Sequence, residues 1–116
     1  MMRPLTPVER ELANAIIDAL PDQTAQAVRV DFARSHQVDD ENGDGSRLVF
    51  DIEGYDRPED TGQHPLPAEG KLKDDDGTEM TASLYIDRND RLYELEIIRW
   101  GDGPIIQPNL SSLRIY

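Results

Sequence analysis

The sequence predicts a single α+β domain over residues 1–116, in which an antiparallel sheet of four or five strands in a meander packs against one or two N-terminal helices on one face. Three observations predict this fold. A helix-capping pattern opens the chain, alternating apolar residues fill its C-terminal half, and 116 residues suit one domain with one modest core.

The first predicted helix spans residues 7–20. Thr6-Pro7-Val8-Glu9 has the form of a capping box, in which the Thr6 side chain accepts from the Glu9 amide and Glu9 reaches back. Leu12 and Ile16 follow at helical spacing. Pro21 ends the helix, because a proline disfavours helical geometry in the residue before it.

The segment after the first helix fits two interpretations. Val28 and Phe32 are four residues apart, as on one face of a helix, but Val28, Val30 and Phe32 also alternate as in a strand. We favour a helix over 23–33 followed by a strand near 35–39.

A turn, a strand and a long loop follow. Residues 39–46 are rich in Asp, Asn and Gly, which are turn residues. Leu48, Phe50 and Ile52 alternate with more polar positions and predict a half-buried strand. Residues 54–68 hold three prolines without periodicity, so we expect a long loop that is functional or loosely ordered.

The C-terminal half predicts a meander of strands over 69–73, 80–86 and 93–97. Ile105-Ile106 and the tail residues Leu113, Ile115 and Tyr116 are expected to pack as an edge segment. Six apolar residues on the inner faces of their elements are expected to form the core: Leu12, Ile16, Leu84, Ile86, Leu95 and Ile97.

Alternation also predicts which residues of the last strands face solvent. Tyr93 should face the core, whereas Glu94 and Glu96 should point outwards. Together with Lys71, Lys73, Thr81 and Ser83 on the neighbouring strands, they predict a solvated, charge-balanced face.

Net charge restricts the partners of this chain. Its formal charge is −12 and its pI is near 4.4, so phosphate backbones and anionic lipids are repelled, and we expect no nucleic-acid or membrane partner. A basic protein would be attracted, although acidity also serves solubility alone. Without cysteine, disulfides and thiolate sites are excluded. No signal-like apolar segment follows Met1, so the cytoplasm is the expected location.

One acidic stretch resembles a calcium loop. Asp40, Asn42, Asp44, Gly45 and Asp51 match a pattern of oxygen ligands around a glycine turn. The match lacks the usual apolar residue, the final Glu and the following helix. We therefore favour an acidic hairpin turn and expect no metal or cofactor, while a metal-binding module using residues 40–51 remains an alternative.

The sequence shows no catalytic motif, and no catalytic residue is assigned. His36 and His64 lack metal-ligand spacing and have no nucleophile elbow near them. An enzyme site beneath the 54–68 loop is the remaining alternative.

Acidic residues gather in one part of the chain. Residues 39–60 contain nine acids and two arginines. Acids on loops held by a rigid sheet suit the recognition of a basic protein. The candidate partner-binding residues are Asp39, Asp40, Glu41, Asp44, Asp56, Glu59 and Asp60.

Three stretches resemble a family of small uncharacterised bacterial proteins known as a domain of unknown function. They are Arg3–Arg10, Leu66–Gly70, and Leu92–Ile97 followed by Asp102-Gly103-Pro104-Ile105. Family members often have a Cys-x-Cys-Gly-Cys-like stretch where this chain has Glu41-Asn42-Gly43-Asp44-Gly45, so the resemblance implies no thiol chemistry here. The strand and Gly-Asp-Gly-Pro turn near the end are also similar to small immunity proteins that neutralise bacterial toxins. The leading hypothesis is a non-enzymatic binding protein, an immunity-type or regulatory partner of a basic, toxin-like protein.

Overall fold

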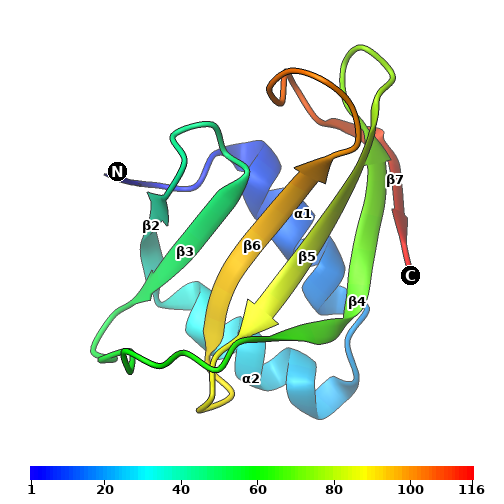
Figure 1. Ribbon diagram of the computed structural model, residues 1–116. Coiled ribbons are helices and arrows are strands. Elements are labelled where there is room, and N and C mark those ends of the chain that lie inside the picture. The colour runs from blue at the N-terminus through cyan, green and yellow to red at the C-terminus, as the bar shows by residue number, and fades with distance from the viewer.

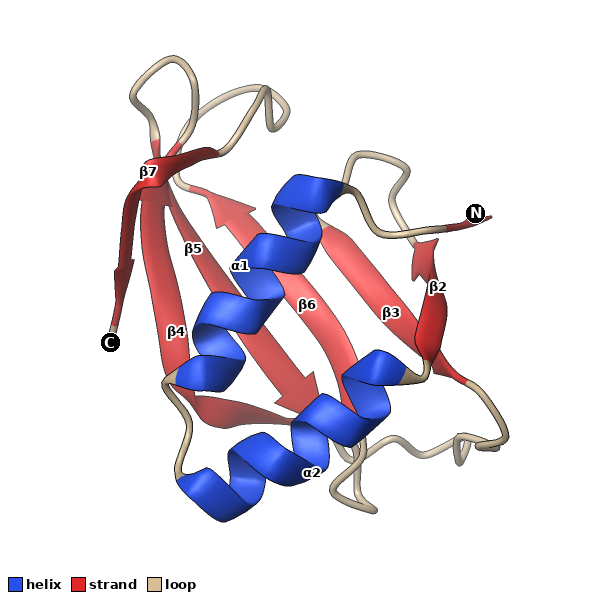
Figure 2. Cartoon of the chain, turned by 180° about the vertical axis from the view of Figure 1, so that it is seen from behind, coloured by secondary structure: helices blue, strands red, loops and turns tan.

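Two helices cover one face of a seven-stranded antiparallel sheet in the computed structural model, which describes residues 1–116 (Figures 1 and 2). The strand order is β1-β2-β3-β6-β5-β4-β7, and the other face has no helix over it. The strands are β1 (Met2–Arg3), β2 (Ser35–Asp40), β3 (Arg47–Ile52), β4 (His64–Lys73), β5 (Glu79–Ile86), β6 (Leu92–Arg99) and β7 (Asn109–Ile115). The predicted α+β class is confirmed, but four or five strands are too few.

The two additional strands are the edges of the sheet. β1 has two residues, which is too short for any alternation to show in the sequence. β7 was expected only as an edge segment, and its apolar residues do not alternate strictly. The five inner strands correspond to the strands that the sequence predicts, near 35–39, at 48–52 and in the C-terminal meander.

Helix α1 (Pro7–Asp18) begins at the predicted capping box. The Thr6 side chain accepts from the Glu9 amide at 3.2 Å, and the Glu9 carboxylate accepts from the Thr6 amide at 2.9 Å. The helix ends two residues before the predicted limit, where the Leu20 amide bonds to the Ile17 carbonyl in a tighter turn.

Helix α2 (Asp22–Ala33) confirms the favoured interpretation of this segment. Val28 and Phe32 are buried and Val30 is 59% exposed, whereas a strand would have buried all three. Phe32 packs edge-on against Phe50 of β3, which fixes α2 over that strand.

The core lies between the helices and the inner face of the sheet. All six predicted core residues belong to it, and Leu84 and Leu95 are direct cross-strand neighbours (Leu12, Ile16, Leu84, Ile86, Leu95 and Ile97). The phasing of β5 and of the second half of β6 is therefore confirmed.

The start of β6 departs from the prediction. Tyr85 is opposite Glu94 and Ile86 is opposite Leu92, so Tyr93 is an extra residue in the strand. Leu92 takes the core position, and the Tyr93 hydroxyl accepts from Arg47 on the outer face. The expectation that Tyr93 faces the core is wrong, because a bulge shifts the alternation by one residue.

Glu94 points to the outer face as expected, but it is not solvated. It is 1% exposed, because Arg47 of β3 covers it and forms an ion pair with its carboxylate. The outer face is thus partly buried at this position.

β4 begins inside the segment predicted to be a loop. His64–Ala68 extends the strand beyond Gly70–Lys73, where β7 pairs with it, so Pro65 and Pro67 lie on an open edge. A proline is tolerated there because no neighbouring strand lies on that side to accept a hydrogen bond from its backbone nitrogen. The loop is shorter than predicted and ends before His64.

Neither helix of the structure has the length and apolar character needed to cross a membrane.

Candidate functional site: the acidic turn and its cleft

The predicted partner-binding residues lie at two opposite ends of β3 (Figure 1). The upper group is at the β2–β3 turn and consists of Asp39, Asp40, Glu41 and Asp44. The lower group is in the β3–β4 connection and consists of Asp56, Glu59 and Asp60. The six residues of β3 span roughly 20 Å at about 3.3 Å each, so the structure does not bring the seven residues into one patch.

Within the upper group, Asp40 organises the turn rather than facing solvent. It is 6% exposed, and its carboxylate accepts from the Gly45 amide at 3.1 and 3.2 Å and from Arg3 at 3.2 and 3.3 Å. Gly45 has φ +77°, a conformation that favours glycine and lets its amide reach Asp40.

The other members of the upper group are more accessible. Asp39 is half-exposed and pairs with the N-terminal amine at 2.6 Å. Asp44 accepts from the Ser46 amide at 3.0 Å, and the Ser46 bonds lower the pKa of its carboxyl group. Glu41 is exposed. The turn therefore presents Asp39, Glu41 and Asp44 as charged groups.

The lower group is more loosely held. All three acids are exposed, and Asp60 lies 3.5 Å from Arg88. The nearby Tyr55 and Arg57 hold the connection to the body of the protein by bonding to Asp87.

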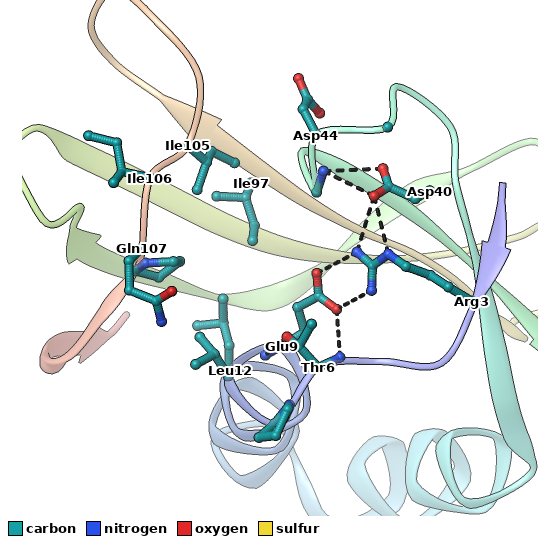
Figure 3. Close-up of a pocket in the computed structure, with 15 residues that line it drawn as sticks. Arg3, Thr6, Glu9, Leu12, Asp40, Asp44, Ile97, Ile105, Ile106 and Gln107 are labelled. Carbon is teal, nitrogen blue, oxygen red and sulfur yellow. Dashed lines mark hydrogen bonds and ion pairs between the residues drawn. The ribbon is translucent and has the colours of Figure 1, made fainter.

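A cleft of about 600 Å³ opens between the acidic turn, the start of α1 and the β6–β7 connection (Figure 3). Its two walls differ in character. One is polar, formed around Arg3, Glu9 and Asp40, and the other is apolar, formed by Leu12, Ile97, Ile105 and Ile106.

The polar wall is a three-residue ion network. Arg3 lies between Glu9 and Asp40 and donates two hydrogen bonds of 2.7 Å to the Glu9 carboxylate. Those bonds, with the Asp40 contact, raise the pKa of Arg3, which stays charged. With Asp44 at the rim, three carboxylates face one cation, so the wall is net negative.

The apolar wall is positioned by a buried aspartate. The Asp74 carboxylate accepts from the amides of Ile106 at 2.9 Å and Gln107 at 2.7 Å, and Arg99 donates to it at 2.8 Å. Ile105 is therefore half-buried against the core, whereas Ile106 is 55% exposed at the mouth of the cleft.

Sequence reasoning missed the cleft because its walls come from segments far apart in the chain. Arg3 and Asp40 are 37 residues apart, and nothing in the local pattern pairs them. Ile105-Ile106, an apolar pair just after a Gly-Pro turn, is the one local signal that could have indicated the apolar wall.

Interior acids bind many of the basic side chains. Six acids are buried, and each forms an ion pair with an arginine. Arg3 pairs with both Glu9 and Asp40, and the other pairs are Arg91–Asp31, Arg99–Asp74, Arg57–Asp87 and Arg47–Glu94. Of the 24 acids and 12 basic residues in the chain, 18 acids and seven basic residues remain for the rest of the surface. Nearly all of the net charge of −12 is therefore on the outside.

The two histidines are on the surface and apart from the cleft. His36 lies 3.1 Å from Glu53, and His64 lies 3.9 Å from Asp90, with all four side chains more than half exposed. The structure contains no group of three or more His, Cys, Asp or Glu side chains that is arranged to hold a metal ion.

Two comparisons, one with curated proteins and one with solved structures, give no match. A comparison with family models matches residues 2–109 to DUF6984, described as a domain of unknown function. This match covers most of the chain, including β1 to β6, both helices and the whole cleft. The chain therefore belongs to the DUF6984 family of domains of unknown function.

Proposed function

We propose that this protein is a non-enzymatic binding protein that recognises a basic protein, in the manner of an immunity-type or regulatory partner. The observation that supports this most is the pairing of five arginines with interior acids, which leaves 18 acids against seven basic residues on the surface. Such a field accelerates the encounter with a basic partner.

The cleft at the acidic turn suits direct contact with that partner. Protein interfaces combine an apolar centre with a polar rim. Here Ile105 and Ile106 supply an apolar surface next to Asp44 and the net-negative wall around Arg3. A basic side chain flanked by an apolar one would match both walls.

The lower acids have a different role in this proposal. Asp56, Glu59 and Asp60 lie at the far end of β3, so a partner seated in the cleft is attracted by them only at long range. Charges outside the contact act mainly on the association rate, whereas desolvated contacts act on the dissociation rate.

The experiment starts with the whole chain as bait in a lysate, followed by binding kinetics of the recovered partner at two salt concentrations. Neutralising the lower group in Asp56→Asn/Glu59→Gln/Asp60→Asn should slow association several-fold and leave dissociation nearly unchanged. Neutralising the upper group in Asp39→Asn/Glu41→Gln/Asp44→Asn should slow association and also speed dissociation.

An apolar pair of variants tests the cleft itself. Ile106→Ser should speed dissociation about tenfold, because it removes an exposed apolar contact at the mouth. Val30→Ser, at a similarly exposed aliphatic residue on α2, is the matched control and should have no effect. A neutral or acidic partner, or an association rate insensitive to salt and to both triple variants, contradicts the proposal.

A second candidate function, a small-molecule enzyme, is favoured by one observation. A hollow of about 450 Å³ lies between α2 and the start of β4, with Val28, Leu66 and Ile86 in its lining and His64 and Asp90 beside them. Turnover that is lost in His64→Ala while the fold is intact would favour this function over binding.

A further inference from the structure

A trough runs along β5. It lies on the face of the sheet that no helix covers, which is the face toward the viewer in Figure 1. On this face β5 presents two short side chains, Thr81 and Ser83. The register places Ser83 between Glu69 of β4 and Glu96 of β6. Short side chains on the central strand with longer ones on both neighbours leave a hollow of about 470 Å³.

The trough is net negative. Its lining includes the carboxylates of Glu69, Glu79 and Glu96 but one basic residue, Lys71, whose ammonium lies 4.7 Å from the centre of the Tyr116 ring. Two further bases lie on this face: Lys73 of β4 is opposite Glu79 of β5 in the register, and Arg47 of β3 is paired with Glu94. The two glutamates beside Ser83, Glu69 and Glu96, form no ion pair with any of these bases, so negative charge remains at this position.

The same negative field is evident at Tyr85, which closes the lower end of the trough. Its hydroxyl donates to Glu96 at 3.2 Å. Burial, together with the carboxylates of Glu96, Glu94 and Glu69, raises the pKa of Tyr85. A cation near this position would be stabilised by the same carboxylates.

An exposed aromatic ring borders the upper end. Trp100 is 64% exposed, and its indole N–H donates to the Thr81 hydroxyl at 3.2 Å, which orients the ring beside the trough. Ile98, 37% exposed, lies next to it on the same face. Tryptophan is enriched among the residues that dominate binding energy at interfaces, and its ring face attracts cations.

We propose that this trough binds an extended basic segment of a partner protein, with a basic side chain between Glu69 and Glu96 and a second group against Trp100. The proposal rests on the proposed function in that the partner is basic, but it places a second contact surface on the opposite side of the sheet from the helices. β5 is paired on both sides, so recognition here uses side chains rather than strand addition.

The strand geometry sets the spacing of the bound segment. Ser83 and Glu79 are four residues apart on β5, or about 13 Å at roughly 3.3 Å per residue. An extended segment along β5 would therefore place residues i and i+4 at the Glu69–Glu96 pair and at the Glu79–Trp100 end.

Trp100 is the only tryptophan of the chain, so its fluorescence reports directly on the trough. The probe is an eight-residue peptide that alternates arginine with serine, titrated into the whole protein at low salt. Peptides with glutamate or glutamine in place of arginine are the controls. We expect a saturable change in Trp100 emission with the arginine peptide alone, and an affinity that falls as salt is added.

A pair of variants separates the trough from diffuse attraction. Glu69→Gln/Glu96→Gln should lower the affinity for the arginine peptide at least fivefold. Glu11→Gln/Asp22→Asn removes the same charge from exposed positions on the two helices and should change the affinity less than twofold. Circular dichroism of each variant confirms that the fold is kept.

Two results would overturn the proposal that the trough binds a basic segment: no change in Trp100 emission, or an equal loss of affinity in both double variants. Neither depends on a native partner, so the trough can fail while salt-dependent association at the acidic turn stands. Conversely, selective binding of the arginine peptide together with a neutral native partner would support a basic-segment site in the trough and overturn the proposed recognition of a basic protein.

Discussion

The guanidinium of Arg99 lies 2.8 Å from the buried carboxylate of Asp74, and this pair ties the turn after β4 to the segment that leads into β7. Asp74 also accepts from the amides of Ile106 and Gln107, while Arg99 donates to the Asp102 carbonyl at 2.9 and 3.1 Å. Two side chains therefore position the whole connection that forms the apolar wall of the cleft.

Replacing Asp74 should be among the most damaging single changes outside the core. Asp74→Ala leaves Arg99, which is 9% exposed, without its buried partner, and leaves the amides of Asp75, Ile106 and Gln107 without their acceptor, so we expect a loss of about 3–5 kcal/mol. Urea unfolding measures this loss as a decrease in the free energy of unfolding. Asp76→Ala, which removes the 40% exposed partner of Arg99, is the control and should cost much less, because solvent screens an exposed ion pair. Equal losses would show that Asp74 has no special role.

Acid should destabilise the protein through its buried aspartates. Burial by itself would raise the pKa of Asp74 and Asp87, but bonds from backbone amides, Tyr55 and the arginines outweigh it and lower both values. A carboxyl whose folded pKa is depressed contributes stability above its unfolded pKa of about 3.9, and the contribution is lost as the pH falls through the folded pKa.

We therefore expect the free energy of unfolding to decline below about pH 4. Many exposed acids lose their mutual repulsion in the same range, so the informative quantity is a difference between variants. Asp87→Asn should flatten the decline between pH 5 and pH 2.5 in urea titrations, compared with the unmodified protein. A decline of unchanged steepness in Asp87→Asn would contradict this account.

Arg57 supplies hydrogen bonds where two strands separate. β3 and β6 pair only over Arg47–Val49, and beyond that point the Arg57 guanidinium bonds to the Phe50 carbonyl at 2.8 Å and the Leu92 carbonyl at 3.0 Å. It also pairs with the fully buried Asp87 at 2.9 Å and lies over the Tyr93 ring.

Arg57→Ala should cost about 3–5 kcal/mol, because the Asp87 charge stays buried without its cation. Arg57→Lys keeps the charge but not the planar fork that reaches several acceptors, so an intermediate loss is expected. Thermal or urea unfolding measures both. Arg88→Ala, at an exposed ion pair with Asp60, should change stability by less than about 1 kcal/mol, and a loss in Arg57→Ala no larger than this would refute the bridging role.

Local patterns predicted most of the elements. The capping box at Thr6 and the alternation through Leu84 and Leu95 act between near neighbours, so the sequence alone predicts them. The exceptions have local causes too. The Tyr93 bulge shifts the alternation, and Pro65 was read as a loop residue although an open edge accepts it.

The candidate site was less predictable, because side-chain pairing across the sheet decides it. Asp40 and Glu94 look like surface acids in the sequence, yet Arg3 and Arg47 cover them from other strands. The composition predicts that the electrostatic field of the surface is negative. Which acids stay unpaired depends on which arginine forms an ion pair with each of them. These pairs depend on the alignment of the strands in the folded sheet, which local sequence patterns do not specify.

The acidic turn leads to the last prediction, which concerns calcium. The Asp40 carboxylate already bonds to Arg3 and to the Gly45 amide, and Asp44 bonds to Ser46. Asp51, the final acid of the calcium-like pattern, is near the far end of β3 and cannot close a loop around an ion held at the turn. A divalent cation would have to displace Arg3 from Asp40, so we expect no specific binding.

Titration calorimetry of the whole protein with calcium should accordingly show weak, non-saturating heats, and the same heats for Asp75→Ala, an exposed acid of another turn. The contrary result is micromolar affinity that Asp40→Ala abolishes and Asp75→Ala preserves. Since Asp40→Ala also removes the partner of Arg3, its unfolding must be measured in parallel. Affinity lost from a variant that is still folded would move the function of the turn from recognition of a basic surface to binding of a metal ion.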